Sequence, residues 1–217
     1  MADLRLYAIG IDEMLDLHGA DPAERPRLQE LAEQNFATAA PVKLPGLLGK
    51  VGPLFKRSPE APVINPTDPT DQDIADFLSG DHMAPDRVPA AWRLLETLVS
   101  ESSWGSIRLQ FGPHEVDEVD FALARGGVAA NVGLHHLLTT STEINLLPVR
   151  DLTVGWYDHE RALAMAEAYR QGLDQVSSAQ QDQVTELIVW LDNFPQWAQN
   201  AAAAQRPIPD LIAFWVQ

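Results

Sequence analysis

The sequence predicts an α+β fold in which several helices pack around a small mixed or antiparallel sheet. Some segments repeat apolar residues at helical spacing, most clearly residues 88–99, where Trp92 and Leu95 share one face. Other segments are short and either alternate apolar with polar residues or are apolar throughout, which is typical of strands. Because helices and strands do not alternate regularly and no internal repeat is present, we expect one α+β domain over residues 1–217.

The composition indicates a globular protein that is soluble and cytoplasmic. Hydrophobic residues make up 46% of the 217 residues and charged residues 21%, which disfavours wholesale disorder. Residues 1–11 contain no basic stretch followed by a long apolar one, and no apolar run is long enough to span a bilayer. We therefore expect no signal peptide and no membrane segment.

Acidic residues outnumber basic ones by 31 to 15, and the formal net charge is −16. Such a charge repels nucleic acids and anionic membranes, so we expect neither as a general partner. It favours association with a basic protein. The chain has no cysteine, which excludes disulfides, thiolate metal sites and cysteine nucleophiles.

The first third of the chain is expected to form a strand and two helices, followed by irregular structure. Leu4–Ile11 is a short apolar run and predicts a buried strand. Acidic residues followed by spaced apolar ones predict helices over residues 12–18 and 22–36, separated by Gly19–Asp21. Residues 41–69 contain seven of the 16 prolines, so we expect a Pro-rich irregular loop there.

The middle of the chain contains capping and strand signals around the 88–99 helix. Thr70 and Asp73 have the spacing of a capping box, which predicts a helix that ends near Gly80. Apolar residues alternate with polar ones over residues 106–111 and predict a half-buried strand. Residues 113–127 predict a helix, because they begin with proline and acidic residues and end with two glycines.

The last third is expected to consist of helices interrupted by two strands. Glu143–Leu147 fits neither pattern clearly, and Pro195 is expected to end or kink the helix before it. The expected elements are helices over residues 128–140, 159–173 and 184–191, and strands over Leu152–Trp156 and Asp210–Val216.

Four segments of the chain suggest a relationship to a known family: Leu6–Asp12, Ala91–Leu95, Val154–Tyr157 and Leu211–Val216. They resemble the YfbM-like family of bacterial domains of unknown function. The family's middle helix pairs tryptophan with histidine, whereas here Arg93 follows Trp92. The resemblance implies an α+β domain and supplies no established activity or site.

A basic segment lies within the Pro-rich region. Lys43, Lys50, Lys56 and Arg57 fall in residues 34–59, a window that contains no acidic residue. The segment fits a mobile lid, an anion-binding loop or a docking strip, since long irregular loops are uncommon without a function. The alternative is that its leucines pack on the body of the protein while the lysines are solvated.

An acidic cluster opens the helix predicted over residues 113–127. Glu115, Asp117 and Glu118 lie in its first turns, where the helix dipole favours carboxylates. They form either a solvated helix face or a contact surface for a basic partner. We expect no metal site, because the adjacent His135 and His136 diverge by about 100° on a helix and do not converge on one ion.

Trp197 is the tryptophan whose setting the pattern leaves open. Trp92, Trp190 and Trp215 lie on apolar patterns and are expected in the core. Trp197 follows Pro195 among polar residues, and it fits either a core position or an exposed anchor for a partner.

These observations lead to two functional hypotheses. The first is a non-enzymatic protein-interaction module, immunity or antitoxin-like, that binds a basic partner through an acidic surface. The second is a small-molecule enzyme or ligand-binding protein in which Lys50, Lys56 and Arg57 contact an anionic ligand. Because no catalytic or nucleotide-binding motif is distinctive, we favour the first, expect no cofactor and leave the oligomeric state open.

Overall fold

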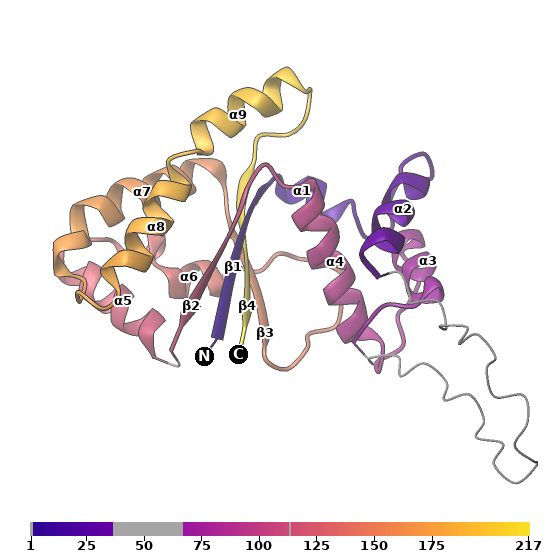
Figure 1. Ribbon diagram of the computed structural model, residues 1–217, viewed down its shortest axis with the longest axis horizontal. Helices are drawn as coiled ribbons and strands as arrows, with labels where there is room; N and C mark the ends of the chain where they lie inside the picture. Colours follow the sequence, from indigo (N-terminus) through magenta and orange to yellow (C-terminus); the bar gives the residue numbers. More distant parts are fainter. Residues whose placement is uncertain (1, 37–66, 113) are drawn as a thin grey trace, which may run out of the picture.

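The computed structural model describes residues 2–36, 67–112 and 114–217. Within them, helices cover both faces of a central sheet, so the fold has three layers and the α+β class is confirmed (Figure 1). The strands are β1 (Ala2–Ile9), β2 (Ser106–Phe111), β3 (Leu152–Tyr157) and β4 (Asp210–Val216).

The described residues form a four-stranded antiparallel sheet with the order β2-β1-β4-β3. The first and last strands of the chain pair with each other at its centre, from Asp3 opposite Val216 to Ile9 opposite Asp210. The two ends of the chain therefore lie side by side (Figure 1). The sequence left a mixed or an antiparallel sheet open, and the pairing is antiparallel throughout.

The central strands are apolar on both faces because each face is covered. Successive side chains of a strand point to opposite faces. In β1, Leu4 and Leu6 belong to one buried cluster, whereas Tyr7 and Ile9 belong to another. The sheet thus separates two hydrophobic cores, which explains why Leu4–Ile11 lacks the alternation of a half-buried strand.

The first core lies beneath the helices that follow β2. Asp158 caps α7 by accepting a hydrogen bond from the backbone N–H of Arg161 at 2.7 Å. Pro195 does not kink α8, because α8 ends before it and Pro195 lies in the first turn of α9. The helices on this side are α5 (Glu115–Arg125), α6 (Leu134–Thr139), α7 (His159–Gly172), α8 (Gln181–Leu191) and α9 (Phe194–Ala203).

The second core lies on the opposite face of the sheet, beneath the helices of the first half of the chain (Figure 1). Trp92 of α4 belongs to it, and its ring meets Phe214 of β4 edge-on at 6.5 Å. The two expected N-terminal helices are shorter than the pattern suggested. The helices on this side are α1 (Ile11–Leu15), α2 (Arg25–Phe36), α3 (Asp71–Ser79) and α4 (Val88–Ser102).

In the second half of the chain, one expectation needs correction and one segment that the sequence left open is now described. Residues 128–140 are helical only in part, because Gly133 is extended and separates a 3₁₀ turn at Ala130–Val132 from α6. Glu143–Leu147 forms neither a helix nor a strand, and Glu143 has a positive φ of 55°. Among the described residues, no helix is long and apolar enough to cross a membrane.

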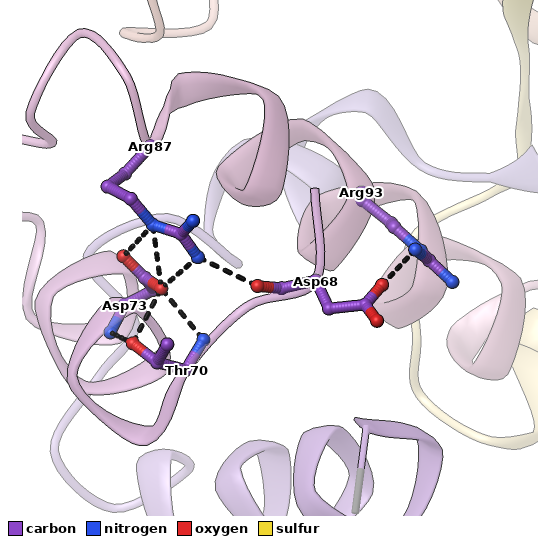
Figure 2. Close-up of polar contacts among 5 residues, drawn as sticks. All are labelled: Asp68, Thr70, Asp73, Arg87 and Arg93. Carbon is purple, nitrogen blue, oxygen red and sulfur yellow. Dashed lines mark hydrogen bonds and ion pairs between the residues drawn. The ribbon is translucent and has the colours of Figure 1, made fainter. Parts of the chain in front are cut away.

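The capping box at the start of α3 is present and is reinforced by an ion pair. Thr70 Oγ1 accepts a hydrogen bond from the Asp73 N–H at 3.2 Å, and Asp73 Oδ2 accepts one from the Thr70 N–H at 2.7 Å. Arg87 donates from Nη2 to Asp73 Oδ2 at 2.7 Å and to the carbonyl oxygen of Asp68 at 2.7 Å (Figure 2). These contacts fix residues 68–73 to the start of α4.

Arg93 joins the two chain segments that flank residues 37–66. Its guanidinium pairs with the Asp68 carboxylate (Figure 2). It also lies 5.6 Å from the ring centroid of Phe36, the last residue of α2. Residues 36 and 68 therefore meet at one point on α4. Most of the Pro-rich loop expected over residues 41–69 lies outside the described residues.

Candidate functional site

The acidic residues predicted for partner binding lie in the first turns of α5, as expected from the sequence. Two of them also make contacts within the fold. Glu115 accepts a hydrogen bond from the backbone N–H of Gly112, and Glu118 Oε2 accepts one from Gln180 Nε2 at 3.0 Å. Both carboxylates are thereby held in place at the surface rather than left to move freely.

Asp117 lies between them in the sequence and is exposed. Its side chain is 70% exposed, and its Oδ1 lies 3.6 Å from Nδ1 of His135. His135 and His136 diverge as expected, because His135 is exposed while Nδ1 of His136 lies 3.1 Å from the hydroxyl of buried Tyr157. Among the described residues, no group of three or more histidine, cysteine or acidic side chains is placed to hold a metal ion.

Asp117 also lines a cavity of about 420 Å³ between α5 and α6. Its apolar lining residues are Leu123, Val128 and three alanines, Ala124, Ala129 and Ala130. Its lining also includes a second carboxylate, Asp120, which is one turn after Asp117 on α5. The cavity thus combines apolar side chains with two carboxylates.

Asp120 caps the start of α6, a structural role that the sequence pattern did not reveal. Its Oδ1 accepts a hydrogen bond from the N–H of Leu134 at 2.8 Å, and its Oδ2 accepts one from the N–H of His135 at 2.7 Å. These are the first N–H groups of α6, whose own N-cap is Gly133 and has no side chain to offer. A Cβ on Gly133 would lie 2.8 Å from Asp120 Oδ2, so glycine permits this approach.

Burial shifts the pKa values of Asp120 and of two nearby tyrosines, Tyr157 and Tyr169. It raises the pKa of Asp120 above its ordinary value, although the two N–H groups that it accepts from favour the charged form. Burial also raises the pKa of Tyr157 and of Tyr169, so both phenols remain neutral donors. Tyr157 donates to the carbonyl oxygen of Gly133 at 2.9 Å, and Tyr169 donates to Asp120 Oδ1 at 3.4 Å.

One sequence signal was available for Asp120. On a helix it shares a side with Val116 and Leu123, which lie four residues before it and three after it and are buried. An acidic residue on the apolar side of an amphipathic helix is expected to have hydrogen-bond partners. The sequence does not show that those partners belong to the start of another helix.

Trp197 lies apart from the acidic residues, since α9 and α5 are at opposite ends of the helical layer (Figure 1). It is half-buried, and its ring meets those of Trp190 and Phe194 with centroids 5.3 Å apart in each case. The ring also covers Gly105, where an added Cβ would lie 2.3 Å from it. The structure thus places Trp197 in packing contacts and does not bring it together with Asp117.

The residues proposed for an anionic ligand, Lys50, Lys56 and Arg57, lie outside the described residues. Their role stays a prediction. In the part of the chain that the structure describes, most arginines are already paired with carboxylates. The pairs are Arg5 with Glu96, Arg27 with Glu24, Arg87 with Asp73, Arg93 with Asp68, Arg108 with Asp3, Arg170 with Glu167 and Asp192, and Arg206 with Glu13.

The fold and this surface define an α+β domain with helices on both faces of an antiparallel sheet and an acidic helix beside a small cavity. The chain belongs to the family described as a domain of unknown function (DUF7691), whose model matches residues 2–216. The matched range runs from the first strand to the last. No curated protein and no solved structure matches the chain.

Proposed function

We propose that this protein is a non-enzymatic interaction module that binds a basic partner protein through the exposed face of α5. The contact surface would centre on Asp117, with Glu115 and Glu118 beside it. The observation that carries the proposal is the placement of these carboxylates. They lie together in the first turn of one surface helix, and contacts to Gly112 and Gln180 hold two of them in position.

The charge balance of the rest of the surface supports the proposal. Because most described arginines pair with carboxylates, they do little to neutralise the remaining acidic residues. On α5 the single basic residue is Arg125, at the end opposite the acidic cluster. A basic partner would therefore be steered toward the start of α5, and this attraction would weaken as salt screens it.

The sharper form of the proposal is an immunity or antitoxin-like role, in which the acidic surface covers a basic active surface on the partner. We propose the cytoplasm as the compartment, following the sequence-based expectation. The resemblance to the YfbM-like family remains a hypothesis about ancestry and contributes no activity to this proposal.

Affinity capture from the native cytoplasm tests the proposal with a charge-matched pair of variants. The test variant is the triple substitution Glu115→Gln, Asp117→Asn and Glu118→Gln, which removes charge but keeps a side-chain oxygen as acceptor. The control neutralises three exposed acidic residues on the other side of the sheet, Asp16, Glu30 and Glu33 (Figure 1).

Each protein is immobilised, and the retained proteins are quantified by mass spectrometry at about 50 mM and about 300 mM salt. The proposal expects a basic protein, retained in stoichiometric amount by the wild type and the control at low salt, to be lost from the test variant. Equal retention by both variants would show that α5 is not the contact surface. Absence of any basic protein from the wild-type capture would contradict the partner class itself.

A further inference from the structure

We infer that the cavity between α5 and α6 receives an arginine side chain of the basic partner. The inference rests on the proposed function and specifies what α5 recognises. It is carried by the shape and chemistry of the cavity, whose volume of about 420 Å³ is at the lower end of ligand-sized pockets. Such a space suits one long side chain better than a cofactor.

Two carboxylates line this cavity from the same helix. Asp117 and Asp120 are three residues apart on α5 and therefore neighbours on its surface. Each oxygen of a carboxylate can accept two hydrogen bonds. Asp120 Oδ2 accepts one, from the N–H of His135, and so retains capacity for a donor inside the cavity.

Asp117 is also available to a ligand, since its side chain is 70% exposed. Its contact with His135 is a surface pair at 3.6 Å between two largely exposed side chains, which contributes less than about 1 kcal/mol. A guanidinium offers five N–H donors in one plane, so it can bind two carboxylates at once. An ammonium group is a point charge and satisfies this pair less well.

The apolar part of the lining fits the aliphatic stem of arginine. Ala124, Ala129 and Ala130 line the cavity with small apolar side chains, against which methylene groups lose contact with water. Asp117 and Asp120, which line the same cavity, would hold the charged head.

An exposed aromatic residue marks the same part of α5. Phe121 is 68% exposed, the highest value among the exposed large apolar side chains of the described residues. It lies four residues after Asp117 and three before Ala124, and it is therefore a surface neighbour of both. A guanidinium or its stem can pack on such a ring, and exposed aromatic residues are enriched in protein interfaces.

A titration with short peptides tests the inference on the full-length protein. The probe is acetyl-Ala-Arg-Ala-amide, and its matched control replaces arginine with citrulline, which has nearly the same shape but no charge. Binding is followed through the backbone amide signals of Ala124, Ala130 and Thr139 in ¹⁵N NMR spectra. We expect concentration-dependent shifts with the arginine peptide and shifts at least about fivefold smaller with the citrulline peptide.

A cavity-filling variant separates this inference from the proposed function. Ala124 is exposed and lines the cavity, so Ala124→Phe fills it and leaves every charge on α5 in place. We expect this variant to lose the arginine-dependent shifts while circular dichroism and the melting temperature remain close to those of the wild type. The charge-matched triple variant of Asp16, Glu30 and Glu33 should titrate like the wild type.

Three results would overturn the inference: equal shifts with both peptides, shifts that avoid α5 and α6, or an Ala124→Phe variant that binds like the wild type. If Ala124→Phe still captures the basic partner as well as the wild type, the cavity is not used and the inference fails while the proposed function stands. If neutralising α5 has no effect on capture, the proposed function fails. In that case arginine-dependent shifts at the cavity would report binding of a free cationic ligand, contradicting the partner side chain inferred here.

Discussion

At the level of single residues, Asp73 and Asp120 both cap helices from inside the fold, yet their pKa values move in opposite directions. Burial alone would raise the pKa of Asp73, but hydrogen bonds and charge from Arg87, with hydrogen bonds from Thr70, outweigh it and lower the pKa. Burial also raises the pKa of Asp120. The net shift stays upward, because the closest donors to its carboxylate are backbone N–H groups without a full charge. The ion pair with Arg87 therefore accounts for the opposite pKa shifts of the two carboxyl groups.

Asp120→Asn tests the raised pKa of Asp120. The variant loses part of the α6 cap, which costs about 1 kcal/mol. A carboxyl whose pKa is raised by folding stabilises the native state most below its unfolded pKa of about 3.9, and this contribution falls as pH rises through the folded pKa. The wild type should therefore have a higher free energy of unfolding than Asp120→Asn, and this advantage should shrink as pH rises from about 4.

Urea unfolding of both proteins across this pH range measures that advantage. An advantage that grows with pH would show that folding lowers the pKa of Asp120.

Arg87→Met tests the ion pair at the start of α3. It leaves the Asp73 carboxylate, whose side chain is 8% exposed, without its charged partner. We expect a loss of about 2 to 3 kcal/mol at neutral pH, less than for a fully buried pair because Arg87 is partly exposed. Since folding lowers the pKa of Asp73, the stabilisation is present above about pH 4 and is lost as pH falls through the folded pKa.

The matched control is Arg93→Met on the same helix, which breaks an exposed pair with Asp68 and should cost less than about 1 kcal/mol. Chemical denaturation of both variants at two pH values makes the comparison. Similar losses from both substitutions would mean that burial of Asp73 adds nothing to the pair.

Trp197→Ala distinguishes a packing residue from an exposed anchor. Because the ring packs against Trp190, Phe194 and Gly105, we expect its removal to lower the free energy of unfolding by about 2 kcal/mol. The melting temperature should fall accordingly, while Val189→Ala, at an exposed position on the neighbouring α8, should leave it nearly unchanged. An unchanged melting temperature combined with loss of partner capture would favour the anchor.

At the level of elements, local patterns located most helices and strands, and distant contacts decided their ends. The capping box of Thr70 and Asp73 was predicted because both residues lie within one turn. The helices α1 and α6 instead begin at glycines, and their caps come from other elements: Asp210 of β4 accepts from the Ile11 N–H at 2.8 Å, as Asp120 does for α6. Spacing along the sequence carries no signal for such caps.

The sequence patterns also did not predict α9 and predicted α6 too long. Proline at the start of α9 reads locally as a helix breaker, whereas its missing N–H is tolerated in a first turn. Gly133 interrupts residues 128–140 because its backbone is extended at the N-cap of α6, where the carboxylate of Asp120 approaches it closely.

Gly155→Ala tests the packing of α6 on the edge strand β3. An added Cβ would lie 1.9 Å from the carbonyl oxygen of Leu137 in α6, and backbone atoms cannot move aside cheaply. We expect a destabilisation of about 3 kcal/mol. Thr153→Ala, at an exposed position of the same strand, is the control and should cost less than about 1 kcal/mol. Thermal unfolding compares the two, and equal small effects would contradict the close approach of α6 to β3.

At the level of the whole molecule, the sequence predicted the fold class but not the order of the strands. The central pair joins the first strand to the last, and nothing within Leu4–Ile11 or Asp210–Val216 indicates which partner each will take. Both segments were predicted as buried strands because they are apolar on both faces, and the two cores of the three-layer fold account for that composition.

The candidate site was likewise predicted only in part from the sequence. The acidic start of α5 was evident from Glu115, Asp117 and Glu118, since composition and helix position are local properties. The cavity beside it was not, because it needs α6 to be placed against α5. Net charge is also a whole-molecule property, and it supports the partner class without locating the contact.

The most direct test of the account is the affinity between the purified protein and the basic protein that it captures. We predict that the Kd of the wild type rises at least about tenfold between about 50 mM and about 300 mM salt. At low salt, neutralising Glu115, Asp117 and Glu118 should raise the Kd by at least about tenfold, and the matched variant on the opposite face of the sheet by less than about twofold. Equal Kd values for the two variants, or a wild-type Kd that salt does not change, would contradict the claim that the acidic face of α5 is the binding surface.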